Sequence, residues 1–321
     1  MVKKIIIDTD PGIDDSLAIF YALNSPELEV LGLTTIFGNA HTSTCTINAL
    51  KLLEIANANH IPVCEGASVP LNGNFRGPAS FVHGDDGQGN SYQDAPSKQK
   101  EELSAVEFLK QSIDNNPGEI TLVPIGPLTN IAQLLIDNPG IDSKINEIVL
   151  MGGNAVSEGN ATPTAEANIL NDPEAADIVF SAKCLVTMVG LDVTNKVFMN
   201  KDEIETLYSF DNPKSKHLEK ITPFYYNFLK VFFEKDGMPI HDSSAITYLL
   251  KPEFFTVIQH PIKVETEGIS RGKTWMALGS SDIEEWQSER LKPWAGRNKI
   301  NICIDVDHQK VIDFIIERNS Y

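Results

Sequence analysis

Residues 4–15 read KIIIDTDPGIDD, and this stretch decides the fold because it combines a buried strand, a tight turn and the start of a helix. The apolar run at residues 5–7 is typical of a strand that is buried on both faces of a parallel sheet. Pro11 and Gly12 favour the turn, and residues 16–20 continue as an amphipathic helix. A strand followed by a helix in this way predicts the first half of a β–α–β unit.

The rest of the chain repeats this alternation of strands and helices. Short apolar runs rich in β-branched residues recur at residues 30–35, 120–125, 145–151 and 184–189. Amphipathic stretches stand between them at residues 17–23, 48–56, 105–113, 130–136 and 173–180. This pattern predicts an α/β fold with an open, mostly parallel sheet and helices on both faces, as in Rossmann-like proteins. We expect a single domain over residues 1–321, because no repeat or long linker divides the chain.

The predicted strands end in polar residues and glycines. The first runs into DTDPG at residues 8–12, and the others run into FGN at 37–39, GP at 126–127, GGN at 152–154 and GLD at 190–192. Ligands of open parallel sheets bind beyond the carboxyl ends of the strands. Glycine is also common wherever strands turn, so the strand ends alone support a site at this edge only weakly.

Two segments have the composition of lids that close over such a site. Residues 73–89 are rich in glycine, and residues 215–239 form an aromatic, amphipathic stretch that contains Pro223. Long segments of this kind in compact domains often move over a ligand. The alternatives are a plain surface excursion for the first segment and a buried helix for the second.

Charge, hydropathy and cysteine spacing limit the partners and the cell compartment that we expect for this protein. The chain has 26 Lys and Arg residues against 44 Asp and Glu residues, which gives a formal charge of −18 and no basic surface for nucleic acid. No stretch approaches the ~20 apolar residues of a membrane span, and the first apolar run is too short for a signal peptide. Cys45, Cys64, Cys184 and Cys303 are widely spaced, which suits reduced thiols. We therefore expect a cytoplasmic protein without nucleic-acid or membrane partners.

Four carboxylates gather directly after the first strand, at Asp8, Asp10, Asp14 and Asp15. Side chains two residues apart on a strand share a face, so Asp8 and Asp10 point the same way. Neighbouring helical residues diverge by ~100°, so Asp14 and Asp15 serve different purposes. Carboxylates this close repel one another unless a cation or firm hydrogen bonds compensate, and an all-oxygen ligand set indicates Ca²⁺ or Mg²⁺.

Three alternatives to a cation site explain the four aspartates less well: a helix cap, an EF-hand loop and a phosphatase motif. A helix cap explains Asp14 or Asp15 alone, but not Asp8 and Asp10 as well. An EF-hand is excluded because its glycine is misplaced and no glutamate closes the loop at the twelfth position. A haloacid-dehalogenase-type phosphatase also opens with an aspartate pair, but within DxDG, whereas here a proline precedes the glycine. The sequence also offers no basic phosphate clamp.

Six motifs, in this order along the chain, resemble those of the inosine–uridine-preferring nucleoside hydrolases. They are DTDPGIDD at 8–15, VHGDDG at 82–87, IGPLTN at 125–130, MGG at 151–153, AEANILNDPEAA at 165–176 and HDSSA at 241–245. The first motif is highly specific, and the resemblance covers nearly the whole chain. It implies a Ca²⁺-dependent ribonucleoside N-ribohydrolase, which splits the N-glycosidic bond of purine or pyrimidine nucleosides into ribose and free base. It also implies a homodimer or a homotetramer.

The resemblance further implies roles for individual residues. It implies a Ca²⁺ ion held by Asp10, Asp15, Asp242 and the main-chain carbonyl of Ile125. Asp10 is then expected to take a proton from a metal-bound water, and His241 is expected to protonate the leaving base. The expected substrate-binding residues are Asp14, Asn39, His83, Met151, Asn160, Glu166 and Asn168.

These residue types suit the reaction. Cleavage of an N-ribosidic bond passes through an oxocarbenium-like transition state, and it needs a carboxylate-activated water and help for the leaving group. A hard cation with an open position can hold the ribose diol and lower the pKa of a water. Polar side chains on the hydroxyls discriminate against sugars that lack them. A histidine with a pKa near neutrality suits protonation of the base.

Plain structural roles are also open to several of these residues. Asn160 and Asn168 could be turn residues, and His241 with Asp242 could cap the helix that follows them. Ala167 stands where many family members carry a bulky side chain, so the preferred base is left open. The alternative function, which only Ala167 favours, is a non-catalytic sensor that binds a nucleoside or ribose without turnover.

Overall fold

The structure is a computed structural model that describes residues 2–277, 289 and 291–321. Its strands are β1 (Lys3–Thr9), β2 (Leu28–Thr35), β3 (Val63–Glu65), β4 (Ile120–Pro124), β5 (Glu147–Met151), β6 (Leu185–Val189), β7 (Phe198–Asn200), β8 (Gly237–Pro239), β9 (Phe255–His260), β10 (Ile262–Val264), β11 (Thr274–Met276) and β12 (Ile300–Val306). Its helices are α1 (Ile13–Leu23), α2 (Thr42–Ile55), α3 (Ser80–His83), α4 (Ala105–Asn115), α5 (Thr129–Asp137), α6 (Ala167–Asn171), α7 (Pro173–Val179), α8 (Leu191–Thr194), α9 (Lys201–Tyr208), α10 (Pro213–Phe233), α11 (Asp242–Leu250) and α13 (His308–Asn319). Short 3₁₀ helices are η1 (Ile141–Lys144), η2 (Pro252–Phe254) and η3 (Lys292–Trp294).

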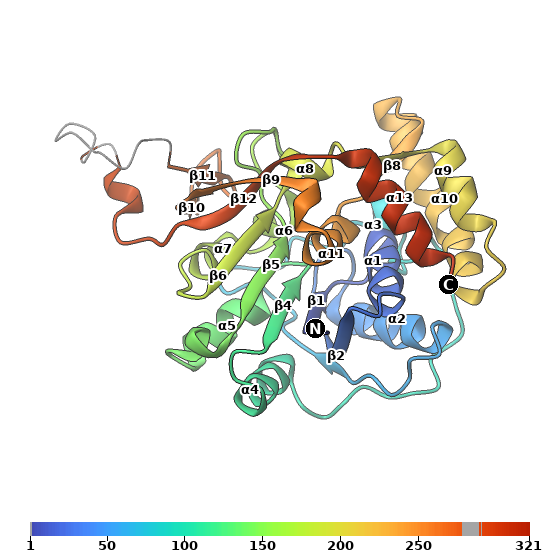
Figure 1. The fold of residues 1–321 in the computed structure, drawn as a ribbon, viewed down its shortest axis with the longest axis horizontal. Helices are drawn as coiled ribbons and strands as arrows, with labels where there is room; N and C mark the ends of the chain where they lie inside the picture. Colours follow the sequence, from blue (N-terminus) through green and yellow to red (C-terminus); the bar gives the residue numbers. More distant parts are fainter. Residues whose placement is uncertain (1, 278–288, 290) are drawn as a thin grey trace.

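The central sheet has the strand order β3-β2-β1-β4-β5-β6-β12-β9, which contains the 3-2-1-4-5-6 order of the Rossmann fold (Figure 1). All neighbouring strands are parallel except β12 and β9, which pair antiparallel. The chain moves from β1 outward through β2 to β3 and then returns to β4 on the other side of β1. Ligands of such sheets bind at this switch point, beyond the carboxyl ends of β1 and β4.

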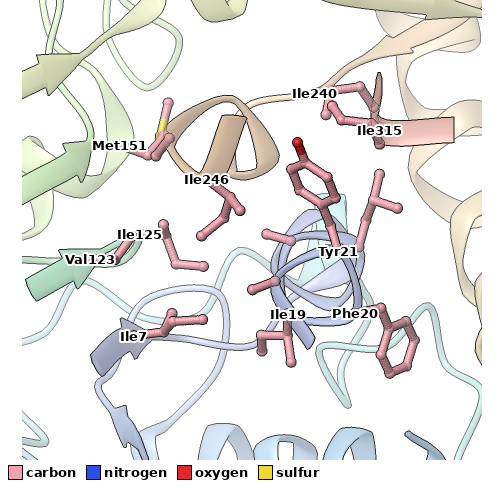
Figure 2. Close-up of a cluster of buried hydrophobic side chains, with 14 of the residues drawn as sticks. Ile7, Ile19, Phe20, Tyr21, Val123, Ile125, Met151, Ile240, Ile246 and Ile315 are labelled. Atoms are coloured by element: carbon pink, nitrogen blue, oxygen red, sulfur yellow. The ribbon is translucent and has the colours of Figure 1, made fainter. Parts of the chain in front are cut away.

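Successive side chains of β1 enter two separate hydrophobic clusters, one on each face of the sheet. Ile5 and Ile7 pack with residues of α1, α2, α10, α11 and α13, whereas Ile6 packs with residues of α4, α5 and α7. Figure 2 shows part of the first cluster, in which Ile7 and Val123 on the strands face Ile19 on α1. Each fully buried isoleucine stabilises the fold by ~1.5–3 kcal/mol, which explains why the strand is apolar without interruption.

The expected α/β fold, with a mostly parallel sheet and helices on both faces, is confirmed. The runs predicted as strands form β1, β2, β4, β5 and β6, and the amphipathic stretches form α1, α2, α4, α5 and α7. Of residues 215–239, for which a lid and a buried helix were both open, residues 215–233 belong to α10, with Pro223 inside the helix, and residues 237–239 form β8. Residues 73–89 contain the short helix α3 in an otherwise irregular segment.

Helix α10 has an N-terminal cap and apolar residues at helical spacing, and both favour a helix. The side chain of Asn212 caps its N-terminus by accepting a hydrogen bond from a main-chain N–H at 2.9 Å. Leu218, Ile221, Tyr225 and Leu229 recur every three or four residues and are buried. This buried face brings Tyr225 toward the carboxyl edge of the sheet, where the candidate site lies.

The cysteines agree with the sequence prediction of reduced thiols. Cys45, Cys64 and Cys303 are buried, Cys184 is half-buried, and all four are free. Within residues 2–277, 289 and 291–321, none of the helices combines the length and the apolar character that a membrane crossing requires.

Candidate active site

Asp15 holds the turn between β1 and α1 in shape. Its Oδ1 accepts a hydrogen bond from the Thr9 hydroxyl at 2.5 Å, and its Oδ2 accepts one from the Gly12 N–H at 3.0 Å. The side-chain amide of Asn39 donates to the same Oδ2 at 2.9 Å. Asp15 therefore closes the N-terminus of α1 and fixes the backbone that carries Asp10.

Asp10 lies between two glycines. Its Oδ2 accepts a hydrogen bond from the main-chain N–H of Asn39 at 2.7 Å, and its buried Oδ1 has no hydrogen-bond partner among the described residues. A Cβ atom added at Gly38 would lie 2.0 Å from Oδ2, and one added at Gly126 would lie 2.5 Å from Oδ1. The glycines after β2 and β4 thus make room for the carboxylate. A buried oxygen left free in this way indicates a partner other than the protein.

Asp14, Asp15 and Asp242 each offer a carboxylate oxygen within 4.8 Å of the other two. Asp242 begins α11 and is 3% exposed, and Oδ1 of Asp14 is buried without a hydrogen-bond partner in the described part of the chain. Burial raises the pKa of all three carboxyl groups and of Asp10, and repulsion between the carboxylates raises it further at Asp10, Asp15 and Asp242. Such a group is costly to keep ionised without a cation.

The donor set at this edge fits a hard cation, because it consists of oxygens. Ca²⁺ takes 6–8 oxygen ligands from carboxylates, carbonyls and water. The carbonyl of Ile125, at the end of β4, accepts a hydrogen bond from the Asn168 side chain at 2.9 Å, and its second lone pair remains for another partner. The Ile125 N–H donates to the carbonyl of Asp8 at 2.8 Å, which ties the ends of β4 and β1 together.

Glu166 and Asn168 lie across the ends of β4 and β5. Glu166 accepts hydrogen bonds from the N–H groups of Gly153 and Asn168 at 3.0 and 2.8 Å. The Asn168 side chain donates to the carbonyls of Ile125 and Met151 at 2.9 and 3.1 Å. The structure therefore brings Met151 into the site through its backbone. Polar side chains held so firmly are preorganised to receive hydroxyl groups.

The other two asparagines expected on the substrate are placed differently from each other. Asn39 is half-buried, and its side-chain amide donates to the Asp10 carbonyl at 3.2 Å as well as to Asp15. Asn160 is exposed, and its Oδ1 accepts a hydrogen bond from the Ala167 N–H at 3.0 Å. Asn39 thus joins the carboxylate cluster, whereas the contact of Asn160 is that of a turn residue.

His241 lies directly before Asp242 and is 7% exposed. Its Nδ1 is 2.8 Å from the hydroxyl oxygen of Thr194. Burial lowers the pKa of His241 to about 4, with smaller contributions from Lys235 and His83. The imidazole is therefore neutral near pH 7, and when the Thr194 hydroxyl donates to Nδ1 the proton is on Nε2.

His83 ends α3 and packs between the acidic turn and α10. Its Nδ1 accepts a hydrogen bond from the Ile13 N–H at 3.1 Å and lies 4.0 Å from Oδ1 of Asp14. Its ring stacks on that of Tyr225, with centroids 6.0 Å apart and an angle of 25° between the planes. Burial lowers the pKa of His83 to about 4. The glycine-rich segment 73–89 thus reaches the site through this histidine.

Asp8 forms its side-chain hydrogen bonds with the neighbouring strand and helix, and not with the residues of the acidic turn. Its Oδ1 accepts hydrogen bonds from the Thr34 hydroxyl at 2.5 Å and from the Asn130 side chain at 2.8 Å. Burial raises the pKa of Asp8 to about 7. These contacts join β1 to β2 and to α5, so this aspartate of the motif is a structural link beneath the site.

The sequence motifs contain most of the residues of the candidate site, but not every residue that contacts them. Thr194 contacts His241 and Tyr225 stacks on His83. Tyr225 belongs to the aromatic segment 215–239. No pattern marked Thr194, because it belongs to none of the motifs and is distant in sequence from His241.

Comparison with known proteins shows similarity to nucleoside hydrolases over nearly the whole chain. Residues 5–313 match the family model described as inosine-uridine preferring nucleoside hydrolase. A probable uridine nucleosidase 2 of Oryza sativa subsp. japonica is 43% identical over 320 residues, which cover 98% of this chain and 92% of that protein. A solved plant nucleoside hydrolase, PpNRh1, is 37% identical with a TM-score of 0.94 and covers 100% of this chain and 99% of its own. A solved purine-preferring ribonucleoside hydrolase from Gardnerella vaginalis is 32% identical with a TM-score of 0.90, over 99% of this chain and 98% of its own.

The matched range includes the strand ends and the helix start that carry Asp10, Glu166 and Asp242. The likeness therefore covers the candidate site and is not confined to the sheet. This chain belongs to the inosine–uridine-preferring nucleoside hydrolase family and is a ribonucleoside hydrolase.

Proposed function

We propose that this enzyme is a Ca²⁺-dependent ribonucleoside N-ribohydrolase that prefers pyrimidine nucleosides, with uridine first among them. The observation that carries the proposal is the group of carboxylates beyond β1, formed by Asp10, Asp14, Asp15 and Asp242. In this group Asp10 and Asp14 each keep an oxygen without a protein partner among the described residues. The preference for uridine is supported by the similarity to a probable uridine nucleosidase at 43% identity, against 32% for a purine-preferring relative.

Asp10, Asp15, Asp242 and the carbonyl of Ile125 would hold the cation, with Asp14 within reach of it. When bound, Ca²⁺ supplies positive charge that attracts the ribose hydroxyls and lowers the pKa of a nearby water. Two features of the protein support this choice of ion. The donors are all oxygens, and within the described part of the chain no protein group donates a hydrogen bond to Oδ1 of Asp10.

Asp10 is the base that takes a proton from the attacking water. Its Oδ2 is anchored by the Asn39 N–H, so its orientation is set before substrate arrives. Its Oδ1 is free to accept the proton.

Glu166, Asn168 and Asp14 bind the sugar hydroxyls, together with Asn39 and Met151, whereas the exposed Asn160 supports the turn before α6 through its contact with the Ala167 N–H. The rigid placement of Glu166 and Asn168 supports this role, because hydroxyl contacts discriminate only when the partner groups cannot relax. A substrate that lacks a hydroxyl leaves these buried polar groups unpaired, which disfavours deoxy sugars.

His241 assists the departing base. The sequence led us to expect a pKa near neutrality and proton transfer to the base, but burial lowers the pKa of His241 to about 4. The neutral imidazole therefore donates a hydrogen bond from Nε2–H, which stabilises the negative charge on the base as the bond to the sugar breaks. The Thr194 hydroxyl favours this tautomer. His83 and Tyr225 lie near the same carboxylates and would flank the bound nucleoside.

A panel of nucleosides tests the proposal. The protein is incubated with uridine, cytidine, inosine and adenosine, in Ca²⁺ and in EDTA, and released ribose is measured. We expect the highest kcat/KM for uridine and loss of activity in EDTA. Absence of ribose release from all four in Ca²⁺ refutes the hydrolase, undiminished release in EDTA refutes the metal requirement, and preference for inosine refutes the choice of base.

We also propose a homodimer or homotetramer in the cytoplasm. The free, mostly buried thiols support a reducing compartment. Light scattering after gel filtration tests the oligomer, and a mass near 35.4 kDa, that of one chain, contradicts it.

A further inference from the structure

The segment between β5 and α6 leads into the sugar-binding residues but has no helix or strand of its own. It carries Asn160 and ends at Glu166, and Asn168 follows in the first turn of α6. A segment of this kind holds hydroxyl-binding groups to within a fraction of an ångström only when other elements support it. Two buried charged residues from elsewhere in the chain, Asp192 and Lys273, contact its first turn.

Asp192 binds the N–H groups of this turn. It lies in the first turn of α8 and is 5% exposed. Its Oδ1 accepts hydrogen bonds from the N–H groups of Val156 and Ser157, both at 2.8 Å, and its Oδ2 accepts one from that of Ala155 at 2.7 Å. Three charge-assisted hydrogen bonds from consecutive residues fix the course of the backbone there.

Lys273 binds the carbonyl groups of the same turn. It stands directly before β11 and is 7% exposed. Its Nζ donates to the carbonyl of Asn154 at 2.8 Å and to that of Ser157 at 3.3 Å. The neighbouring Thr274 hydroxyl accepts a hydrogen bond from the Asn154 N–H at 2.8 Å. The turn thus has an anion on its N–H groups and a cation on its carbonyls.

The clamped turn is bonded to the residues that face the sugar. The Gly153 N–H donates to Oε2 of Glu166 at 3.0 Å. The Asn154 side chain donates to the carbonyl of Thr164 at 3.1 Å, two residues before Glu166. A displacement of the turn therefore moves Glu166 and the start of α6 with it.

We infer that Asp192 and Lys273 are positioning residues, which hold residues 153–168 where their side chains meet the sugar hydroxyls. The inference rests on the proposed function, from which it takes the sugar-binding roles of Glu166 and Asn168. Loss of either charge loosens the hydroxyl contacts and leaves the carboxylate cluster in place. The protein then distinguishes ribose less well from sugars that lack one hydroxyl.

The test compares Asp192→Asn and Lys273→Met with the wild-type protein. Calorimetry in Ca²⁺ measures the binding of D-ribose and of its 2-deoxy, 3-deoxy and 5-deoxy analogues. Asp142→Asn is the matched control, because Asp142 is also buried and accepts a main-chain hydrogen bond, from Lys183 at 2.9 Å. Asp142 lies before β5, at the opposite edge of the sheet.

We expect both variants to lose about tenfold or more of the preference for ribose over at least one deoxy analogue, while Asp142→Asn keeps the wild-type preference. A merely structural role would lower the melting temperature and leave these ratios unchanged. Unchanged ratios in a folded variant overturn the inference, and if one variant does not fold, the other decides. Uridine hydrolysis is assayed separately. A wild-type protein that binds ribose but hydrolyses no nucleoside contradicts the proposed function alone.

Discussion

The main-chain N–H of Asn39 donates a hydrogen bond of 2.7 Å to Oδ2 of Asp10, and this contact makes the two oxygens of the carboxylate unequal. Oδ2 is anchored at the end of β2, whereas Oδ1 is buried without a partner among the described residues. Gly38 and Gly126 give the carboxylate the space that a Cβ atom at either position would fill. An anchored group with one free oxygen is preorganised for both metal binding and proton transfer.

Replacement of Asp10 by alanine should remove the base for the attacking water. We expect kcat for uridine to fall by about 10³-fold or more, with a circular dichroism spectrum like that of the wild-type protein. Asp114→Ala is the control, because Asp114 is an exposed carboxylate on α4 that pairs with Lys110 and Lys144. Near-normal turnover in Asp10→Ala contradicts the role of this residue.

Removal of Ca²⁺ should destabilise the protein, because the buried carboxylates then repel one another. Binding to the folded state alone stabilises it by ~2.7 kcal/mol when free Ca²⁺ is one hundred times its dissociation constant. Scanning calorimetry in EDTA and in rising Ca²⁺ measures the shift, and Asp242→Asn should reduce it. A melting temperature that does not respond to Ca²⁺ speaks against the metal site.

Replacement of His241 by alanine should slow the reaction most where the leaving group needs help. We expect kcat for uridine to fall by about 10²-fold, while 4-nitrophenyl riboside, whose nitrophenolate leaves unaided, loses little. Thr194→Val should change kcat for uridine in the same direction by a smaller factor, because only the orientation and tautomer of the imidazole are affected. Equal losses on both substrates would assign His241 to binding instead.

The stability of the protein should depend on His217, a buried histidine of α10. Its Nε2 lies 2.9 Å from Oε1 of Gln88, and burial lowers its pKa to about 4. The unfolded chain takes up a proton near pH 6.5 and the folded chain only near pH 4. The free energy of unfolding that depends on a neutral His217 is therefore at its full value above pH 6.5. It falls by ~1.4 kcal/mol per pH unit as pH falls from 6.5 toward 4.

Urea unfolding of the wild-type protein and of His217→Gln at pH 5 and pH 7 isolates this effect. Subtraction of the two free energies of unfolding removes the titration of all other groups. The wild-type protein should exceed the variant by more at pH 7 than at pH 5. The same difference at both pH values contradicts the lowered pKa.

The sequence predicted the strands well and the long segment 215–239 less well. Strands buried on both faces leave a continuous apolar run, and that local signal suffices for β1 and for the four others predicted. The aromatic segment admitted both a lid and a helix, because Pro223 in the middle disfavours a helix locally. Burial of Leu218, Ile221 and Tyr225 on one face outweighs that cost.

Among the site residues, those within one motif were the easiest to predict. Asp10 and Asp15 belong to a single turn, so their meeting follows from local geometry. Asp8 has the same residue type as Asp10 and stands two residues before it, yet it bonds to Thr34 and Asn130. These partners come from β2 and α5, so the spacing of residues within the motif could not predict them.

The sequence by itself determined the α/β architecture and the acidic chemistry of the first turn, because both depend on the periodicity and composition of short segments. The tertiary structure alone decided that Asp242 meets Asp15, that Thr194 meets His241, and that Asp192 clamps the turn after β5. These partners come from elements that become neighbours only when the strands take their order in the sheet. That order is set by packing over both faces at once, and no single segment carries the information for it.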